Sequence, residues 1–204
     1  MKGRLIVFEG IDGAGKTTQI ELLAEYLQQK GRRVYRTAEP TESVTGGLLR
    51  DALGGVSKRS PGEMAALFVL DRIFHNVNPV NGFNKMTGDG VDVICDRYYY
   101  SSLAYQGSET DFEWVRRMNL DCPEIRRPDL CIFLDIPPAA ALERIGKRGE
   151  AKEIYEKEET LTLFRKTFLK VFDTLPDRVA IINAEGAPEE VAARVSAAVE
   201  PLLH

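Results

Sequence analysis

Cysteine is scarce in this sequence, and its spacing gives no sign of joint chemistry. The three cysteines, Cys95, Cys122 and Cys131, cannot all pair with one another, and none lies in a C-x-x-C or Cys/His spacing suited to zinc. Cys95 and Cys131 lie inside apolar runs, where a small thiol commonly forms part of the core. We therefore assign no metal or redox chemistry to the cysteines.

The chain also lacks long hydrophobic runs and an excess of positive charge. The longest apolar stretches, residues 5–8 and 65–70, are far shorter than the roughly 20 residues that span a bilayer, and Glu9 ends the first too early for a signal peptide. With 27 basic and 31 acidic residues, the net charge of -4 creates no general attraction for nucleic acid or anionic membranes. We expect a cytoplasmic protein that binds neither.

The overall composition and length are typical of one globular domain. The 204 residues are 44% hydrophobic and 28% charged, and a length near 200 favours a single domain spanning residues 1–204. Short apolar runs alternate with longer stretches of helical period. The runs predict strands at Leu5–Glu9, Val34–Thr37, Val91–Asp96, Leu130–Ile136 and Val179–Asn183. The stretches predict helices at Thr17–Lys30, Pro61–Asn76, Phe112–Leu120, Pro138–Ile145, Glu153–Leu175 and Pro188–Leu203.

Nearly continuous apolar strands separated by helices are typical of a buried parallel sheet. We therefore predict an α/β fold with a doubly wound, five-stranded parallel sheet flanked by helices. A Gly-punctuated charged segment, Gly146–Lys152, precedes the long helix near the C-terminus and is the expected lid loop within this domain.

The strongest motif, G-x-x-x-x-G-K-[ST], lies between the first strand and the first helix. Its glycines let backbone N–H groups close around phosphate oxygens, while Lys16 reaches the β- and γ-phosphates and the Thr17 hydroxyl can ligate Mg²⁺. The fold is therefore expected to be of the P-loop NTPase type. The predicted ATP-binding residues here are Gly10, Ile11, Asp12, Gly13, Ala14, Gly15, Lys16, Thr17 and Thr18.

Other segments narrow the class of P-loop protein. A GTPase reads guanine with N-K-x-D, and the nearest match, residues 84–87, has Thr87 where the Asp is needed. Motor and transporter ATPases usually end a hydrophobic strand in Asp-Glu, whereas here the strand ends in Asp96-Arg97. At the ligand-binding edge of the sheet, Asp96 can position Mg²⁺ or its waters and Arg97 can neutralise phosphate oxygens during transfer. These residues favour a kinase over a hydrolytic ATPase.

One face of the expected helix at Pro61–Asn76 pairs an aromatic ring with a cation. Phe68, Arg72 and His75 follow one another at spacings of four and three residues. A nucleotide acceptor needs a surface on which its base can stack and a guanidinium for its phosphate. The spacing favours a second nucleotide pocket, with His75 in a structural role.

Taken together, these residues resemble the thymidylate kinase family along nearly the whole chain. The likeness runs through residues 8–19, 39–41, 67–75, 96–106, 128–130, 134–135 and 148–149, and the D-R-Y-x-x-S-x-x-A-Y-Q stretch from Asp96 to Gln106 is its most selective part. The resemblance implies Mg²⁺-dependent phosphoryl transfer from ATP to dTMP, giving dTDP for dTTP synthesis, by a homodimer.

The resemblance also implies roles for single residues. Phe68 would stack on thymine, Arg72 and Arg97 would hold the acceptor phosphate, and Tyr105 would pack against the sugar where a 2′-hydroxyl would clash. The expected dTMP-binding residues are Asp12, Glu39, Phe68, Arg72, Arg97, Ser102, Tyr105 and Gln106, and the expected Mg²⁺ ligands are Thr17 and Asp96.

Members of this family carry a catalytic arginine either in the P-loop or in the lid. Gly13 and Ala14 occupy the P-loop positions, so the lid is expected to supply it. Arg148 is the first candidate, ahead of Arg144 and Lys152. The expected catalytic residues are thus Lys16, Asp96, Arg97 and Arg148, and Arg144 is assigned to ATP binding.

One departure from the family pattern bears on the acceptor. Ala38 stands where many members carry Arg, so the acceptor phosphate has one cation fewer than is common. Two alternatives therefore stay open. One is a related kinase acting on dUMP, dCMP or another acceptor, and the other is a P-loop switch without useful kinase turnover.

Overall fold

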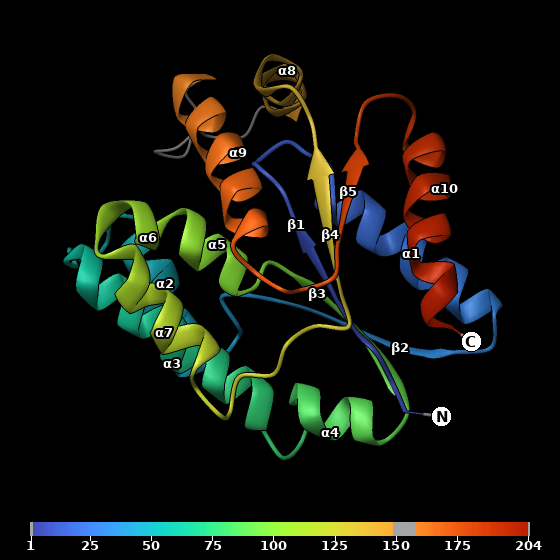
Figure 1. Cartoon of the computed structure of the whole chain (residues 1–204), viewed down its shortest axis with the longest axis horizontal. Helices are drawn as coiled ribbons and strands as arrows, with labels where there is room; N and C mark the ends of the chain where they lie inside the picture. Colours follow the sequence, from blue (N-terminus) through green and yellow to red (C-terminus); the bar gives the residue numbers. More distant parts are fainter. Residues whose placement is uncertain (1, 149–157, 204) are drawn as a thin grey trace.

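The computed structural model describes residues 2–148 and 158–203, in which five parallel strands form one sheet with helices on both faces (Figure 1). The strands are β1 (Leu5–Glu9), β2 (Arg33–Ala38), β3 (Val91–Asp96), β4 (Leu130–Asp135) and β5 (Val179–Asn183), and they lie side by side in the order β2-β3-β1-β4-β5. The central position of β1 explains why all five of its residues are buried. The predicted doubly wound α/β fold is confirmed.

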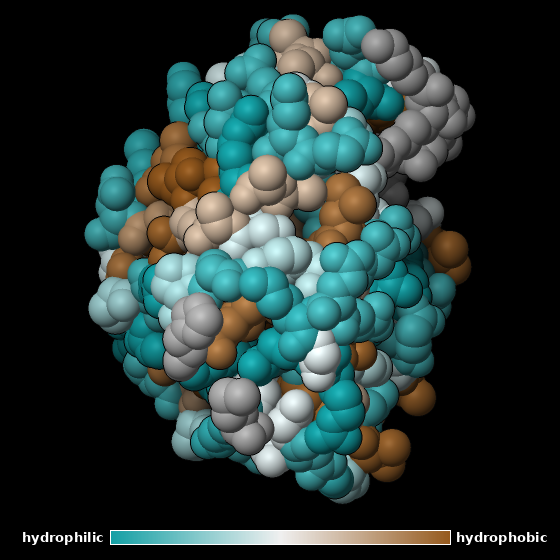
Figure 2. Space-filling model, turned by 90° about the vertical axis from the view of Figure 1, so that its right-hand side faces the viewer, coloured by the Kyte–Doolittle hydropathy of each residue, from teal (hydrophilic) through white to brown (hydrophobic). Residues whose placement is uncertain are grey.

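Alternate residues of β1 divide the core into two clusters. Ile6 and Phe8 pack with α1 (Lys16–Gln29) and α10 (Pro188–Val199), which the short 3₁₀ helix η1 (Glu200–Leu202) extends. Leu5 and Val7 belong to the opposite cluster, because successive side chains of a strand point to opposite faces. Figure 2 shows the right-hand side of Figure 1, where most of the surface is hydrophilic and apolar residues form small patches.

The second cluster lies under the helices on the left of Figure 1. These are α3 (Pro61–Val77), α5 (Tyr99–Ala104), α7 (Phe112–Leu120) and α9 (Glu158–Asp173). The remaining helices are α2 (Val44–Leu53), α4 (Phe83–Gly88), α6 (Gln106–Glu109) and α8 (Pro138–Arg148). In the described ranges, no helix has both the length and the hydropathy that a bilayer-spanning segment requires.

The helix ends follow local sequence signals. At the start of α3, Ser60 accepts a hydrogen bond from the Glu63 N–H and the Glu63 carboxylate accepts one from the Ser60 N–H, with Pro61 in the first helical position. This capping fixes the beginning of the helix that carries Phe68 and Arg72.

The structure extends α8 beyond the predicted end at Ile145. The helix continues to Arg148, so the first three residues of the predicted lid loop, 146–148, are helical. The rest of that segment, including Lys152, and the predicted start of the next helix at Glu153 lie outside the described residues.

Candidate active site

The predicted site residues gather where three neighbouring strands end. The P-loop follows β1, Asp96-Arg97 lies at the end of β3, and Glu39 follows β2. Strand register brings these ends together, since Asp96 is paired with Phe8 of β1 and with Ala38 of β2. The carboxyl edge of an open parallel sheet is where such folds bind ligands.

The P-loop depends on glycine at two of its positions. Gly15 has a φ of 93° at the start of α1, and Gly13 has a φ of 79°. A Cβ atom on Gly13 would lie 2.5 Å from the carbonyl oxygen of Ala141 in α8. Lys16 begins the helix, and its Nζ donates to the Gly10 carbonyl at 3.2 Å, so the loop closes around the lysine. Burial, reinforced by Arg97, lowers the pKa of Lys16.

Three charged side chains form a cluster beside the loop. Arg97 donates from Nη2 to Oδ1 of Asp12, and the Lys16 Nζ lies 3.9 Å from the same oxygen. Burial alone would raise the pKa of Asp12, but Arg97 and Lys16 hold it below its usual value, so this carboxylate is ionised. The second terminal nitrogen of Arg97, Nη1, donates at 3.2 Å to the hydroxyls of Ser101 and Tyr105.

A cavity of about 230 Å³ lies on one side of the P-loop. Arg144 of α8 lies against it and donates to the carbonyls of Ala14 at 3.4 Å and Ala184 at 2.9 Å. Ile11 is in the core, whereas Thr17 is exposed in the first turn of α1. The cavity is lined by Ala14, Gly15, Thr18, Gln19, Arg144, Ala184, Gly186, Pro188 and Val191, and we refer to it as the P-loop cavity.

A larger cavity of about 460 Å³ lies between α2, α3 and α5, and we refer to it as the α3 cavity. Most of the residues predicted to bind dTMP line it, namely Asp12, Glu39, Phe68, Arg72, Arg97, Tyr105 and Gln106. Ser102 does not line it. Its hydroxyl is buried and accepts from Nη1 of Arg72 at 3.2 Å, so Ser102 helps to hold the Arg72 side chain in place without lining the cavity.

Arg72 is fixed more firmly than the sequence suggested. Its Nε and Nη2 donate to Oε2 of Glu39 at 2.8 and 2.7 Å, and Nη1 also donates to Asn119. His75 lies 3.2 Å from the other oxygen of Glu39 and 2.8 Å from the Thr37 hydroxyl, which fits its predicted structural role. A contact between Arg72 and the acceptor phosphate stays a prediction, because the guanidinium is 1% exposed and engaged with Glu39.

Arg50 lines the α3 cavity and was not predicted from the sequence. It lies near the end of α2, donates from Nη1 to the Thr41 carbonyl at 2.6 Å, and has Nη2 3.4 Å from the Glu42 carboxylate. Ala38 lines the same cavity, so Arg50 supplies a cation to the cavity in which the sequence departs from the common family pattern. The available signal was a basic residue shortly after the strand β2, in what the structure shows to be the last turn of α2.

The residues expected to bind Mg²⁺ have the chemistry that this ion needs. Oδ1 of Asp96 is buried with no hydrogen-bond partner among the described residues, and Thr17 is exposed in the first turn after the P-loop. Oxygen ligands of this kind suit Mg²⁺, which usually takes few protein ligands beside substrate phosphates. The described residues contain no group of three or more His, Cys, Asp and Glu side chains placed so that they could hold a metal ion by themselves.

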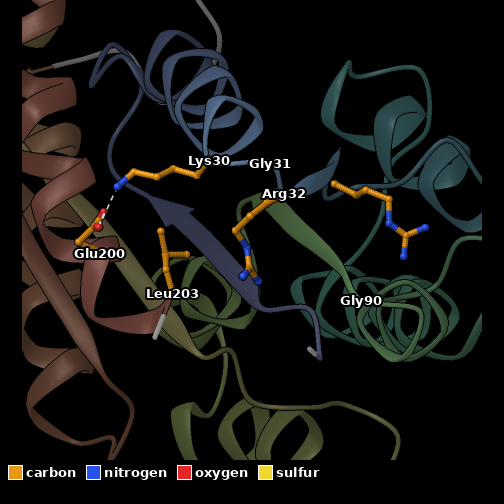
Figure 3. A pocket seen from close by; sticks show the side chains of 7 residues that line it. Lys30, Gly31, Arg32, Gly90, Glu200 and Leu203 are labelled. Carbon is orange, nitrogen blue, oxygen red and sulfur yellow. Dashed lines mark hydrogen bonds and ion pairs between the residues drawn. The ribbon is translucent and has the colours of Figure 1, made fainter.

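A third cavity, of about 340 Å³, lies at the opposite edge of the sheet (Figure 3). It is lined by Lys30, Gly31, Arg32, Arg33, Gly90, Glu200 and Leu203. Lys30 already pairs with Glu200 at 2.9 Å, and Arg32 pairs with Asp92. None of the predicted site residues lies there.

Comparison with known proteins distinguishes between the classes of P-loop protein. The family model for thymidylate kinase matches residues 8–195. The chain belongs to the thymidylate kinase family. Members are ATP-dependent nucleoside monophosphate kinases, so a hydrolytic ATPase or a switch protein is not favoured.

Relatives of the thymidylate kinase family match nearly the full length of the chain. It is 42% identical to the thymidylate kinase of Akkermansia muciniphila, over 95% of this chain and 90% of that protein. It is 39% identical to a probable thymidylate kinase of Pyrococcus horikoshii, over 98% of this chain and 97% of that protein. A probable thymidylate kinase of Archaeoglobus fulgidus is 36% identical, over 98% and 96%.

Proposed function

We propose that this chain transfers the γ-phosphoryl group of ATP to dTMP, giving ADP and dTDP. The observation that carries the proposal is the cluster of Asp12, Lys16 and Arg97, in which Asp12 and Arg97 line the α3 cavity and Lys16 directly follows a residue of the P-loop cavity. Phosphoryl transfer needs two phosphates held end to end with cations at the point of exchange. The two cavities and the charged cluster meet that need.

The donor is assigned to the P-loop side. The backbone N–H groups of residues 10–18 would bind the phosphates of ATP, with Lys16 at the β- and γ-phosphates. Arg144 would contact the nucleotide in the P-loop cavity, which it already borders. The γ-phosphoryl group would then lie beside Arg97.

The acceptor is assigned to the α3 cavity. Thymine would stack on Phe68, and the 5′-phosphate would turn toward Arg97, with Arg50 as a further cation on the cavity wall. Tyr105 would lie against the sugar. Burial raises the pKa of Tyr105 to about 12, so its phenol stays protonated and accepts from Arg97 without adding charge.

Catalysis in this proposal consists of positioning and charge neutralisation. The phosphate of dTMP is itself the nucleophile, so no side chain has to become covalently modified. Mg²⁺, when bound with ATP, would neutralise phosphate charge. Thr17 and Asp96 would hold the ion or its waters, and Lys16 and Arg97 would stabilise the charge on the transferring group. Arg148 is proposed to complete the set of catalytic cations.

A coupled assay of ADP release tests the proposal. The purified chain with Mg²⁺ and ATP would be given dTMP, dUMP, dCMP or no acceptor, and ADP release should be fastest with dTMP. Faster release with another monophosphate would assign a different acceptor. ADP release that no acceptor stimulates would favour a switch protein.

The proposal includes a homodimer in the cytoplasm. Leu70, Phe74 and Val77 of α3 are 51%, 42% and 41% exposed and lie on one side of the helix at spacings of four and three residues. We call these three residues the outer apolar face of α3. An apolar face of this kind, on the helix that carries Phe68, suits contact with a second copy of the chain. Light scattering would measure the oligomeric state, and cell fractionation would test the location.

A further inference from the structure

Glu9 is a buried carboxylate to which neither the sequence motifs nor the proposed mechanism gives a role. It is the last residue of β1, directly before the P-loop, and it is 0% exposed. Burial raises its pKa to about 7, against the opposing effects of Arg97 and a Ser101 hydrogen bond. Keeping an ionisable group there costs stability, so its contacts are informative.

Three hydrogen bonds join the Glu9 carboxylate to the segment that follows Arg97. Oε1 accepts from the backbone N–H groups of Tyr98 at 2.8 Å and Ser101 at 3.1 Å. Oε2 accepts from the Ser101 hydroxyl at 2.7 Å. These are the N–H groups at the start of α5, whose N-cap residue Tyr98 makes no side-chain cap, so Glu9 caps the helix from the neighbouring strand.

The capped segment is the one that aims Arg97. Arg97 has a φ of 65°, which is uncommon for a residue other than glycine, and its N–H donates to the Phe8 carbonyl at 2.8 Å. Backbone conformations of this type persist only where the surroundings impose them. Phe8 and Glu9 are consecutive in β1, so the same strand end holds the backbone on both sides of Arg97.

Ser101 joins Glu9 to the guanidinium itself. Its hydroxyl donates to Oε2 of Glu9 and accepts from Nη1 of Arg97 at 3.2 Å. A hydroxyl can donate one hydrogen bond while accepting others, so both contacts exist together. Arg97 therefore has two links to this end of β1, the direct ion pair with Asp12 of the P-loop and a path through the Glu9 carboxylate and the Ser101 hydroxyl.

We propose that Glu9 is a positioning residue for phosphoryl transfer, which holds Arg97 in its catalytic orientation through Ser101 and through the capped start of α5. The inference rests on the proposed function. Because Glu9 also adjoins Gly10, it ties the donor loop and the acceptor arginine to one point in the molecule.

Glu9→Gln separates this role from a contribution to folding. The amide oxygen can still accept from the N–H groups of Tyr98 and Ser101, so the cap persists. The amide nitrogen cannot accept from the Ser101 hydroxyl, which then has to reorient beside Arg97. Since a displacement near 1 Å can cost about a hundredfold in rate, kcat with dTMP should fall at least about tenfold, while KM for ATP changes less than about twofold.

A double-mutant cycle tests the path through Ser101. Ser101→Ala alone should lower kcat, and adding it to Glu9→Gln should cause little further loss, because both changes remove the same link. Ser108→Ala is the matched control: its exposed hydroxyl donates to the Tyr105 carbonyl at 2.7 Å, outside this link, and it should leave kcat unchanged in either background.

Each outcome decides the matter. A wild-type kcat in Glu9→Gln would overturn the inference. So would a loss of kcat from Ser101→Ala that is equally large in the wild-type chain and in the Glu9→Gln chain. If Glu9→Gln does not fold, Ser101→Ala still puts the inference at risk, since it leaves Glu9 and both backbone contacts in place, and an unchanged kcat in that variant would overturn the inference. Failure of the wild-type chain to release ADP with dTMP would instead refute the proposed function.

Discussion

Phe68 and Arg50 lie on two neighbouring helices, and in the proposed function they divide the recognition of the acceptor between them. Phe68 lies on α3, is half-buried and lines the α3 cavity, while Arg50 brings a guanidinium from α2 to the same cavity. A base requires a flat apolar surface and a phosphate requires a cation. The two side chains should therefore affect different parts of the same ligand.

Phe68→Ala should weaken the binding of dTMP without weakening the binding of ATP. Stacking of a base on an aromatic ring contributes about 1–3 kcal/mol, so KM for dTMP should rise by about fivefold to over a hundredfold. Steady-state kinetics with each substrate varied would measure this, with the melting temperature as a check on folding. Equal increases in both KM values would show that Phe68 supports the fold rather than the base.

Arg50→Ala should weaken the binding of dTMP more than the binding of thymidine, because only dTMP carries the phosphate. A single partly exposed cation at a phosphate corresponds to a loss of about fivefold in affinity. Equilibrium binding of both ligands would measure the ratio, and Ala38→Arg in the same variant should restore part of the loss. Arg36→Ala is the matched control, because Arg36 lies near Glu21 and does not line the cavity. An unchanged ratio would remove Arg50 from the site.

The raised pKa of Glu9 predicts how stability depends on pH. Its pKa is about 7 in the folded chain against an ordinary value of 4.5, so the folded state retains a proton that the unfolded chain has released. Its contribution is present below about pH 4.5 and is lost as pH rises through about 7, a change of about 3 kcal/mol at most. Urea unfolding of the ligand-free chain at pH 5 and 7.5 should show this loss, and Glu9→Gln should reduce it. Equal pH dependence in both proteins would contradict the assignment.

Strands and helices could be predicted from the sequence where the apolar pattern is clear and extends over enough residues. The apolar runs gave the bounds of β1, β3 and β5 as the structure has them, and α3 differs by one residue at its end. The helices α2, α4, α5 and α6 were not predicted. The last three have six, six and four residues, and α5 depends on Glu9 for its cap, a contact between residues 89 or more apart in the chain.

Candidate site residues could be named from the sequence for a related reason, and their roles stay predictions. The P-loop and the Asp96–Gln106 stretch are contiguous motifs, so their side chains could be identified without knowing how the chain folds. The sealed environment of Arg72 and the position of Arg50 could not, because Glu39, Asn119 and Ala38 approach them from distant segments. The left-handed backbone at Arg97 likewise arises from tertiary contacts and has no local signal.

Helix α8 carries two arginines, four residues apart, for which we predict different effects. Arg144 borders the P-loop cavity, so Arg144→Ala should raise KM for ATP with a smaller effect on kcat. Arg148 is proposed to act on the transferring group, so Arg148→Ala should lower kcat by about a thousandfold or more while both KM values stay close to wild type. Kinetics at saturating ATP and dTMP would compare the two. A loss of kcat under about fivefold in Arg148→Ala, or a larger loss of kcat in Arg144→Ala, would exclude Arg148 as a catalytic residue.

At the scale of the whole molecule, the sheet separates two surfaces of different character. The side with α1 and α10 is mostly hydrophilic (Figure 2), whereas α3, which lies on the other side in Figure 1, exposes Leu70, Phe74 and Val77. The same helix turns Phe68 and Arg72 toward the α3 cavity. Contact between two copies through the outer apolar face of α3 would therefore stiffen the helix that is proposed to bind the acceptor base.

Phe74→Glu should convert the proposed dimer into a monomer. A charge placed in the middle of the outer apolar face of α3 would have to be buried without a partner, which costs several kcal/mol and exceeds what one apolar side chain contributes to association. Light scattering at matched concentrations would give the mass. In the monomer, KM for dTMP should rise while KM for ATP changes less, because α3 carries Phe68 but no part of the P-loop. Leu163→Glu is the matched control, since Leu163 is 57% exposed on α9 and lies outside this face. A wild-type chain that is already monomeric, or a Phe74→Glu chain that keeps the dimer mass, would show that this face of α3 does not join two copies.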